Sequence, residues 1–504
     1  MSFIAHLANM CADFFRIAMG DRPVASRSKG TPLFLYNTLS GTSQEFKSTI
    51  PGVVKMYNCG PTVYGPQHIG NLSMFVFVDV LRRTLEFNGY RVKQVINFTD
   101  VGHLVSDADD GEDKMTKGLK REGKALTLEN MRTLGERYAQ LFLADLATLN
   151  IETGGTEFPR ASAYIAAQIA MVRTLEEKGY AYVGKKGVYF ETTMFPAYGR
   201  LGNINLEGLR EGARIEASPD KRNSTDFLLW KFSAKGRSAS GGDIGWDSPW
   251  GKGFPGWHIE CSAMARAILG EQIDIHTGGI EHIPVHHNNE IAQSEAATGK
   301  KPFSRFWLHR AHLQIGGSKI AKSGGNSIYL GDVAEKGFNP LAFRYLLLGS
   351  HYRTPASFTW EALAAAQNSL VRLSNLYRDF TSNAEGGSAL HYMQFFEERI
   401  NDDLDTPGAL AVLWDMTKDA TVSGAEKARA MEKFDTVFGL NIAGQSEQNA
   451  EIPAEVEELV LRREAAREAK NWSRADELRD EIASRGYAVK DTESGPRLSR
   501  NNKV

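Results

Sequence analysis

The chain has 504 residues, of which 42% are hydrophobic, and a formal net charge of −2 at pH 7. This length suffices for about three domains, and the hydrophobic content excludes wholesale disorder. No apolar run approaches the roughly 20 residues that span a membrane, so we expect no membrane association. The small net charge neither indicates nor excludes a nucleic-acid partner, because a local basic face can exist on a neutral protein.

Residues 1–31 are expected to form an N-terminal extension. Apolar residues recur at rough helical spacing over 3–17, while Asp13 and Asp21 argue against a targeting segment, which is the weaker alternative. The extension holds Cys11, one of three cysteines in the chain. So few cysteines argue against a disulfide framework and predict a reducing compartment, which we take to be the cytoplasm.

From residue 53 to about 98 the pattern is strand, turn, helix, strand. Such a unit implies two parallel strands joined by a right-handed crossover. Ligands bind beyond the carboxyl ends of such strands, where Cys59 and Thr99 fall. The turn carries His68, and the helix N-terminus behind it makes a natural anion site. One segment therefore offers both a thiol ligand and a phosphate-handling group.

The remaining pattern alternates helices with short strands, which makes the fold class α/β. Residues 104–124 are charged and glycine-bearing and are expected to form a solvated loop, and 191–256 read as an insertion rich in glycine, proline and aromatic residues. From 335 to about 440 the pattern is mainly helical. Other expected elements are helices at 127–149 and 159–179, a hairpin at 181–190, a strand at 272–276, a helix from about 286, helices at 453–470 and 473–484, and a hairpin-like end near 487–489.

Four residues far apart in the sequence form a chemically sensible zinc set: Cys59, Cys261, His286 and Glu290. Thiolates, imidazoles and carboxylates are the usual zinc ligands, and His286 and Glu290 share one face if their segment is helical. The spacing alone does not prove a site, because there is no compact Cys-x-x-Cys pair. The alternative is two buried cysteines that behave as small apolar residues, beside a surface histidine.

A short basic, glycine-rich loop places Lys319 and Lys322 three residues apart. Two ammonium groups on a mobile loop suit the charge that develops on a polyphosphate. Taken alone the loop is weak evidence, since lysine–glycine loops are usually just solvated.

Together these motifs resemble cysteinyl-tRNA synthetase, a family of class I aminoacyl-tRNA synthetases, from about residue 32 to 497. Each motif is modest alone, but their number and order make the match specific. The His-Ile-Gly-His-type motif reads His-Ile-Gly-Asn at 68–71, and the Lys-Met-Ser-Lys-Ser-type loop reads Lys-Ile-Ala-Lys-Ser at 319–323. The other matching segments are 59–64, 97–101, 246–251, 255–264 and 286–295.

The resemblance implies a Rossmann-type class I synthetase catalytic domain at 32–333, with an insertion near 150–256. A stem-contact and helical bundle domain would follow at 334–443. A small C-terminal anticodon-binding unit would occupy 452–500. The expected fold is therefore an α/β catalytic domain followed by helices and a small terminal module.

The resemblance also implies roles for single residues. Cys59, Cys261, His286 and Glu290 match the family's zinc ligands, which implies one Zn²⁺ per chain that selects a soft substrate thiolate. Thr99 and Trp257 match positions that hold the amino acid. Their alternative roles are a strand-end hydroxyl and an ordinary core aromatic residue.

Four further residues match positions that contact ATP: His68, Asn71, Lys319 and Lys322. Asn71 replaces the second histidine of its motif, and its amide can still donate a hydrogen bond. The alternative role for His68 is to cap the helix that follows it.

The implied reaction joins L-cysteine to tRNA(Cys) in two steps. ATP, accompanied by Mg²⁺, converts cysteine to cysteinyl-adenylate, and the cysteine then passes to the 3′ end of the tRNA. Catalysis of this kind is mostly positioning and charge stabilisation, so no protein nucleophile is needed. We expect the enzyme to act as a cytoplasmic monomer.

Two alternatives compete with this interpretation. A related ligase that joins cysteine to an amino sugar shares the zinc and ATP motifs but lacks the anticodon unit, so residues 452–497 argue against it. A catalytically silent RNA-binding paralogue is supported only by Asn71 and the altered 319–323 loop. The complete zinc set and both lysines argue against this second alternative.

Overall fold

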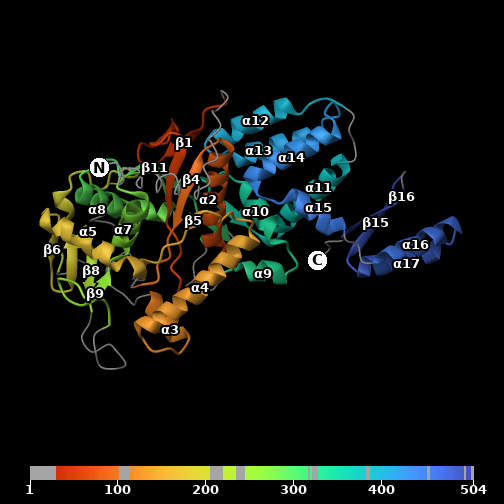
Figure 1. The fold of residues 1–504 in the computed structure, drawn as a ribbon. Helices are drawn as coiled ribbons and strands as arrows, with labels where there is room; N and C mark the ends of the chain where they lie inside the picture. The colour runs from red at the N-terminus through yellow and green to blue at the C-terminus, as the bar shows by residue number, and fades with distance from the viewer. Residues whose placement is uncertain are drawn as a thin grey trace, which may run out of the picture.

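The computed structural model describes residues 30–101, 114–204, 220–233, 244–315, 318–319, 327–381, 386–450, 454–492 and 495–500. Residues 1–29 of the expected N-terminal extension and Lys322 lie outside the described residues. Figure 1 shows a central sheet with helices packed on both sides, a helical region beside it, and a small unit at the C-terminal end.

The centre of the molecule is a five-stranded parallel sheet with the order β11-β10-β3-β4-β5. The predicted strand–helix–strand unit is confirmed, because β3 and β4 pair in parallel and α2 connects them. The predicted strand near 272–276 is also confirmed, as β10 pairs with β3. The strands are β3 (Val53–Asn58), β4 (Arg91–Ile96), β5 (Thr156–Glu157), β10 (Ile273–Gly279) and β11 (Ser304–Arg310).

Helix α2 (Ile69–Phe87) is the crossover helix, and it is mostly buried. Apolar residues on several of its faces allow it to pack on the sheet, on α4 (Leu128–Thr148) and on the helical region at once. Phe75 of α2 meets Phe142 of α4 edge to face, with ring centroids 4.7 Å apart. Because α2 is surrounded, its position is fixed relative to the strands on which the site is built.

The expected solvated loop at 104–124 is wrong over α3 (Lys114–Arg121), while 102–113 lie outside the described residues. Met115 and Leu119 are four residues apart, share one face of α3 and are buried in the same core cluster as Leu134 of α4. Lysine or arginine occupies four of the other six positions, which hid this short apolar face in the sequence.

The inserted segment carries its own antiparallel sheet, which contains the predicted hairpin near 181–190. Helices α5 (Ile165–Glu177) and α7 (Trp257–Leu269) pack beside it, and α7 leads into β10 of the central sheet (Figure 1). The strands of the inserted sheet are β6 (Ala181–Val183), β7 (Gly187–Phe190), β8 (Phe227–Phe232) and β9 (Gly253–Pro255). Helix α8 (Asn288–Thr298) packs on α7 and connects β10 to β11.

Two small sheets complete this part of the chain. The hairpin of β1 (Phe34–Asn37) and β2 (Thr42–Glu45) lies against β11. A second sheet contains β12 (Leu313–Ile315), β13 (Ser318–Lys319) and β14 (Ala356–Phe358).

The region after the catalytic strands is helical, as expected. Its core is rich in phenylalanine, and the rings of Phe396 and Phe434 stack with centroids 4.0 Å apart. The helices are α9 (Leu330–Glu335), α10 (Pro340–Leu348), α11 (Trp360–Thr381), α12 (Leu390–Asn401), α13 (Thr406–Lys418), α14 (Gly424–Phe438) and α15 (Ile442–Ala450).

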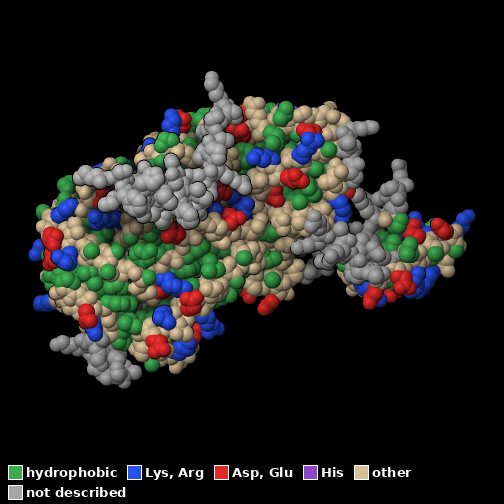
Figure 2. Space-filling model, in the orientation of Figure 1, with side chains coloured by type: hydrophobic (Ala, Val, Ile, Leu, Met, Phe, Trp, Pro, Cys, Tyr) green, Lys and Arg blue, Asp and Glu red, His purple; other side chains and the backbone are tan. Residues whose placement is uncertain are grey.

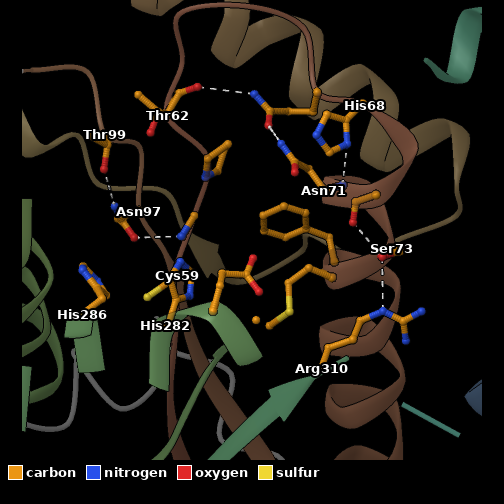
Figure 3. A pocket seen from close by; sticks show the side chains of 18 of the residues that line it. Cys59, Thr62, His68, Asn71, Ser73, Asn97, Thr99, His282, His286 and Arg310 are labelled. Atoms are coloured by element: carbon orange, nitrogen blue, oxygen red, sulfur yellow. Dashed lines mark hydrogen bonds between the residues drawn. The ribbon is translucent and has the colours of Figure 1, made fainter. Parts of the chain in front are cut away.

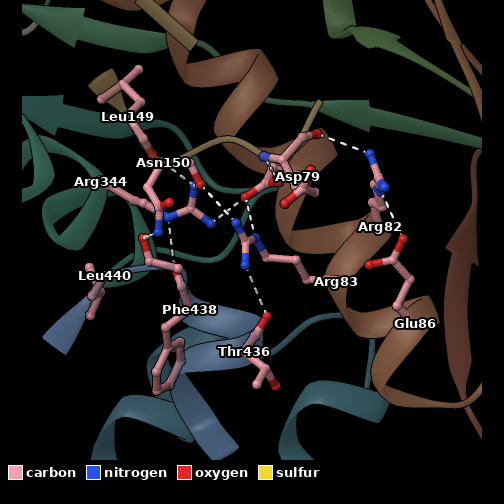
Figure 4. Close-up of polar contacts among 12 residues, drawn as sticks. Asp79, Arg82, Arg83, Glu86, Leu149, Asn150, Arg344, Thr436, Phe438 and Leu440 are labelled. Atoms are coloured by element: carbon pink, nitrogen blue, oxygen red, sulfur yellow. Dashed lines mark hydrogen bonds and ion pairs between the residues drawn. The ribbon is translucent and has the colours of Figure 1, made fainter. Parts of the chain in front are cut away.

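A buried ion pair joins α2 to this helical region (Figure 4). Arg344 of α10 is fully buried, and its Nη2 lies 2.5 Å from Asp79 Oδ2. Its other nitrogens donate to the carbonyl oxygens of Leu149, Asn150 and Phe438. Arg83 Nε donates to the same Asp79 oxygen at 2.7 Å. The guanidinium of Arg344 therefore has partners from three separate parts of the chain.

The C-terminal unit has a hydrophobic core of its own. Arg463 holds its hairpin to its first helix by donating to both carboxylate oxygens of Asp491, at 2.9 and 3.0 Å. Trp472, at the start of the second helix, is 59% exposed. The elements are α16 (Ala454–Glu468), α17 (Trp472–Ser484), β15 (Tyr487–Thr492) and β16 (Gly495–Arg500).

Acidic and basic side chains are interspersed over the face of the molecule drawn in Figure 2, in keeping with the small net charge. Among the described residues, no helix is both long and apolar enough to cross a membrane.

We expect Arg344→Met to lower the free energy of unfolding by about 3–5 kcal/mol, because it leaves the buried Asp79 carboxylate without its main partner. Urea titration followed by circular dichroism measures the loss. Lys418→Ala is the control: it removes an ion pair with Asp415 whose side chains are both well exposed, and should cost less than about 1 kcal/mol. Equal losses in the two variants would contradict a structural role for the buried pair.

Candidate active site and metal centre

A cavity of about 580 Å³ opens at the carboxyl ends of the central strands. Its walls come from the residues after β3 and β4, from the ends of β10 and β11, and from the first turns of α2. This is the place where open parallel sheets bind ligands. Figure 3 shows the side chains of α2 on one side of the cavity and those of Cys59, Thr99 and His286 on the other.

Four buried residues bring potential metal ligands together beside this cavity: Cys59, His286, His287 and Glu290. Their ligand atoms all lie within 4.8 Å of one another. Cys59 Sγ is 3.3 Å from His287 Nε2, and His286 Nε2 is 3.0 Å from Glu290 Oε1. Three of these residues belong to the predicted zinc set, while His287 was not predicted.

Cys261, the fourth predicted ligand, lies on α7 just outside that group. It is buried, and its Sγ is 3.7 Å from Asn97 Oδ1. A hydrogen bond with Cys59 and a further one with His286 lower the pKa of its thiol below the ordinary value. The structure therefore places Cys261 in contact with two members of the group.

Two residues of the group, Glu290 and His287, already have the protonation state that a metal requires. Burial lowers the pKa of His286, but Glu290 and Cys261 outweigh this effect and raise the pKa to about 10, so its ring gives up a proton when a metal binds. Burial raises the pKa of Glu290, but His276 and His286 outweigh this effect and hold the pKa at about 2, so the carboxylate is ionised at neutral pH. Burial lowers the pKa of His287 well below its usual range, which leaves a neutral ring with a lone pair to offer. Metal binding requires an ionised carboxylate and a neutral imidazole.

Neighbouring residues orient these ligands. His287 Nδ1 lies 2.7 Å from His309 Nε2, and His309 Nδ1 lies 2.8 Å from Thr38 Oγ1, so His287 Nε2 faces Cys59. His286 Nε2 is buried and forms no aligned hydrogen bond within the described part of the chain. A buried imidazole nitrogen that lies between a thiol and an ionised carboxylate fits a soft divalent cation such as Zn²⁺.

The backbone on either side of Cys59 is locked in place. Cys59 N donates to Thr277 O, and Gly60 N donates to Asn97 Oδ1 at 2.9 Å. A Cβ atom at position 60 would lie 1.6 Å from Asn97 O, so only glycine allows β3 and β4 to end this close together. The thiol is therefore held by two neighbouring strands.

Thr99 and Trp257 both line the cavity on the side of the thiols. Thr99 Oγ1 donates to Glu260 Oε2 at 3.0 Å, and Trp257 packs against His286 with ring centroids 4.2 Å apart. Trp257 is half-buried at the start of α7, so it is a cavity wall and not an ordinary core aromatic residue.

His68 is the N-cap of α2, with Nδ1 accepting from Asn71 N at 3.1 Å. The same ring lines the cavity, so capping and ligand contact are compatible roles. Asn71 Nδ2 donates to Gln67 Oε1 at 2.6 Å, and Gln67 Nε2 donates in turn to Gly65 O. The amide that replaces the second histidine of the motif is therefore held in a fixed orientation at the cavity wall.

Comparison with known proteins agrees with this arrangement. The tRNA synthetases class I (C) catalytic domain matches residues 45–368, and the cysteinyl-tRNA ligase anticodon binding domain matches residues 449–495. The chain belongs to the cysteine–tRNA ligase family of class I tRNA synthetases.

Relatives in this family match almost the whole chain. Cysteine–tRNA ligase 1 of Burkholderia lata is 44% identical over 469 residues, which cover 93% of this chain and 97% of the relative. The cysteine–tRNA ligase of Treponema denticola is 40% identical and covers 91% of this chain and 98% of its own length. Family members are ligases, so the chain is identified as an enzyme of that class.

A solved structure shares the fold at low sequence identity. Methionyl-tRNA synthetase of Mycobacterium tuberculosis, bound by methionyl-adenylate, superposes with a TM-score of 0.52 and is 15% identical. The match covers 78% of this chain and 91% of the other. It supports the class I synthetase fold and nothing finer.

Of the two lysines in the predicted ATP-binding loop, the structure describes one. Lys319 lies in β13, where its backbone pairs with Gln314, and Lys322 falls outside the described residues. The structure adds cavity residues that sequence reasoning missed: Lys114 and Lys117 of α3, and Arg310 at the end of β11. For α3, the spacing of Met115 and Leu119 was the available signal; for Arg310 the sequence offered none.

We expect the purified protein to hold about one zinc per chain and Cys59→Ser, Cys261→Ser and His286→Asn each to lose most of it. His287→Asn should weaken zinc binding by about 10–100-fold, as expected when an orienting neighbour is removed. Atomic absorption after dialysis against graded zinc buffers measures both effects. Cys11→Ser is the control and should keep its zinc. Unchanged zinc in Cys261→Ser would remove Cys261 from the ligand set.

Proposed function

We propose that the chain activates L-cysteine with ATP to cysteinyl-adenylate and transfers the cysteine to the 3′ end of tRNA(Cys). The observation that carries this proposal is a single cavity with two different ends. One end carries buried thiol, imidazole and carboxylate donors, and the other carries the N-terminus of α2 capped by His68. Such a cavity suits a small thiol substrate next to a phosphate-bearing one.

We propose that Cys59, Cys261, His286 and Glu290 hold one Zn²⁺ and that His287 orients Cys59. Zinc in this place supplies a soft Lewis acid for the sulfur of cysteine. Apolar packing distinguishes near-isosteres such as cysteine and serine by only about 10–200-fold. A soft metal prefers a thiolate to a hydroxyl more strongly, so this donor set explains selection without an editing site. Thr99 and Trp257 then enclose the rest of the amino acid.

The nucleotide is assigned to the α2 side of the cavity. His68 and Asn71 would contact its phosphates, together with Lys319 of β13 and Lys322, and Mg²⁺ would accompany the ATP. The positive end of the α2 dipole favours an anion in the same place. These groups position the α-phosphate against the carboxylate of cysteine and stabilise the charge that develops, so the chain needs no nucleophile of its own.

The rest of the chain is assigned to the tRNA. We propose a catalytic domain at 32–333 with its insertion near 150–256, a stem-contacting helical bundle at 334–443 and an anticodon-binding unit at 452–500. The match of residues 449–495 to an anticodon binding domain supports the last assignment and argues against the amino-sugar ligase. Unpaired anticodon bases are read by stacking and by edge hydrogen bonds.

We propose a monomer, because all the residues to which the reaction is assigned above belong to one copy of the chain. The two described cysteines are buried free thiols, which favours a reducing compartment, and we assign the protein to the cytoplasm.

We expect the protein to exchange radioactive pyrophosphate into ATP when cysteine is present, with serine at the same concentration more than about 200-fold less effective, which is beyond what packing alone provides. The exchange rate in zinc-containing buffer measures this. His391→Ala, a change on the surface of the helical bundle, is the control and should exchange at the wild-type rate. Absence of cysteine-dependent exchange from zinc-loaded protein would overturn the proposed function.

Deletion of residues 452–504 should leave pyrophosphate exchange within about twofold of wild type, because the C-terminal unit has a separate core. Charging of tRNA(Cys) should fall by at least about 10-fold in kcat/KM, since each lost base stack weakens binding. Paired exchange and charging assays on one preparation give both values. An equal loss of the two activities would contradict separate modules.

A further inference from the structure

Arg310 differs from the other buried arginines that the structure describes. Each of the other buried arginines has a carboxylate partner: Arg82 pairs with Glu86 at 2.8 Å, Arg344 with Asp79 at 2.5 Å, and Arg463 with Asp491 at 2.9 Å. Arg310 has no carboxylate partner among the described residues. The one hydrogen bond of Arg310 within the described chain runs from Nε to Ser73 Oγ at 3.2 Å.

That hydrogen bond ties Arg310 to the start of α2. Arg310 is the last residue of β11 and is 5% exposed. Ser73 Oγ donates to Gly70 O at 2.7 Å, so its proton is used there and its lone pair accepts from Arg310 Nε. Both Arg310 and Ser73 line the cavity. The Nη1 and Nη2 groups, which form no hydrogen bond with a described residue, are left for a ligand.

The electrostatics of Arg310 point in the same direction. Burial alone lowers the pKa of its guanidinium to about 10, with no acidic neighbour to offset the desolvation. The side chain is still charged at neutral pH. A buried cation without a partner is costly, so proteins seldom keep one unless an anion joins it.

The place of Arg310 in the cavity identifies the kind of anion. In Figure 3, Arg310 and Ser73 lie on the α2 side, and Cys59, Thr99 and His286 lie on the opposite side. Lys114 and Lys117 also line the cavity, and Glu281 is the one carboxylate among its described lining residues. A cavity with more cations than anions, next to a helix N-terminus, favours a polyanion.

We propose that Arg310 binds a phosphate group of the nucleotide and that Ser73 positions it for this contact. The planar guanidinium presents two N–H groups in a geometry that matches two phosphate oxygens. This inference rests on the proposed function, because that proposal assigns the nucleotide to this side of the cavity. It adds to the proposed phosphate contacts a residue that lies outside the two motifs at 68–71 and 319–323.

The first test is cysteine-dependent pyrophosphate exchange by Arg310→Met, which keeps the length of the side chain but removes its charge. The KM for ATP should rise by about 10-fold or more, the change expected from losing a charge-assisted hydrogen bond, with the KM for cysteine within about twofold of wild type. Arg310→Lys should restore part of the loss. Arg266→Met, which removes a half-exposed arginine of α7 paired with Glu271, is the matched control and should leave both KM values unchanged.

The second test measures binding without catalysis. In calorimetry, Arg310→Met should weaken a non-hydrolysable ATP analogue by about 10-fold and leave adenosine, which has no phosphate, unchanged. Ser73→Ala should weaken the analogue less. This measurement needs no cysteine, so it tests Arg310 even if the wild-type protein fails to exchange.

Three results would overturn the inference: an unchanged KM for ATP in Arg310→Met, a rise in the KM for cysteine instead, or equal weakening of adenosine and the ATP analogue. Wild-type protein that lacks cysteine-dependent exchange would instead refute the proposed function. The two failures are therefore distinguishable.

Discussion

The buried pair of Asp79 and Arg344 is the constraint on which the arrangement of the domains depends. Asp79 is in the third turn of α2, eight residues after Asn71, or about 12 Å along the helix axis. The first turns of α2 therefore form the cavity wall, and the middle of the helix is fixed to the helical region by the ion pair of Asp79 with Arg344. Both side chains are buried, so water cannot replace either partner. Because α2 is one continuous helix, a displacement of the helical region at Arg344 would also move the cavity wall at the start of α2.

Hydrogen bonds from a distant segment also support the candidate metal ligands. The hairpin of β1 and β2 looks peripheral, yet Thr38, which lies between the two strands, contacts His309. His309 contacts His287, which lies beside Cys59. A chain of hydrogen bonds thus connects the hairpin to the ligand group. Support of this kind fixes ring orientation, and a metal site depends on orientation as much as on ligand identity.

Much of this could be predicted from the sequence, because two signals were strong. The unit of β3, α2 and β4 has clear periodicity, and the four-residue spacing of His286 and Glu290 predicted a shared face. The involvement of His287 was not predictable, because the chain forms a wider turn over Ile283–His287 that buries both histidines. Arg310 was missed for a different reason: a strand-end arginine looks solvated until its lack of a carboxylate partner is visible in three dimensions.

The exposure of Trp472 has a practical consequence. The chain has eight tryptophans, and Trp472 is the one among them whose side chain is largely exposed. Water-exposed indoles emit at longer wavelength and are quenched by acrylamide, whereas buried ones are shielded. The red edge of the intrinsic fluorescence therefore reports on the C-terminal unit alone. A nucleic-acid base stacking on this indole would change that signal without any label being attached to the protein.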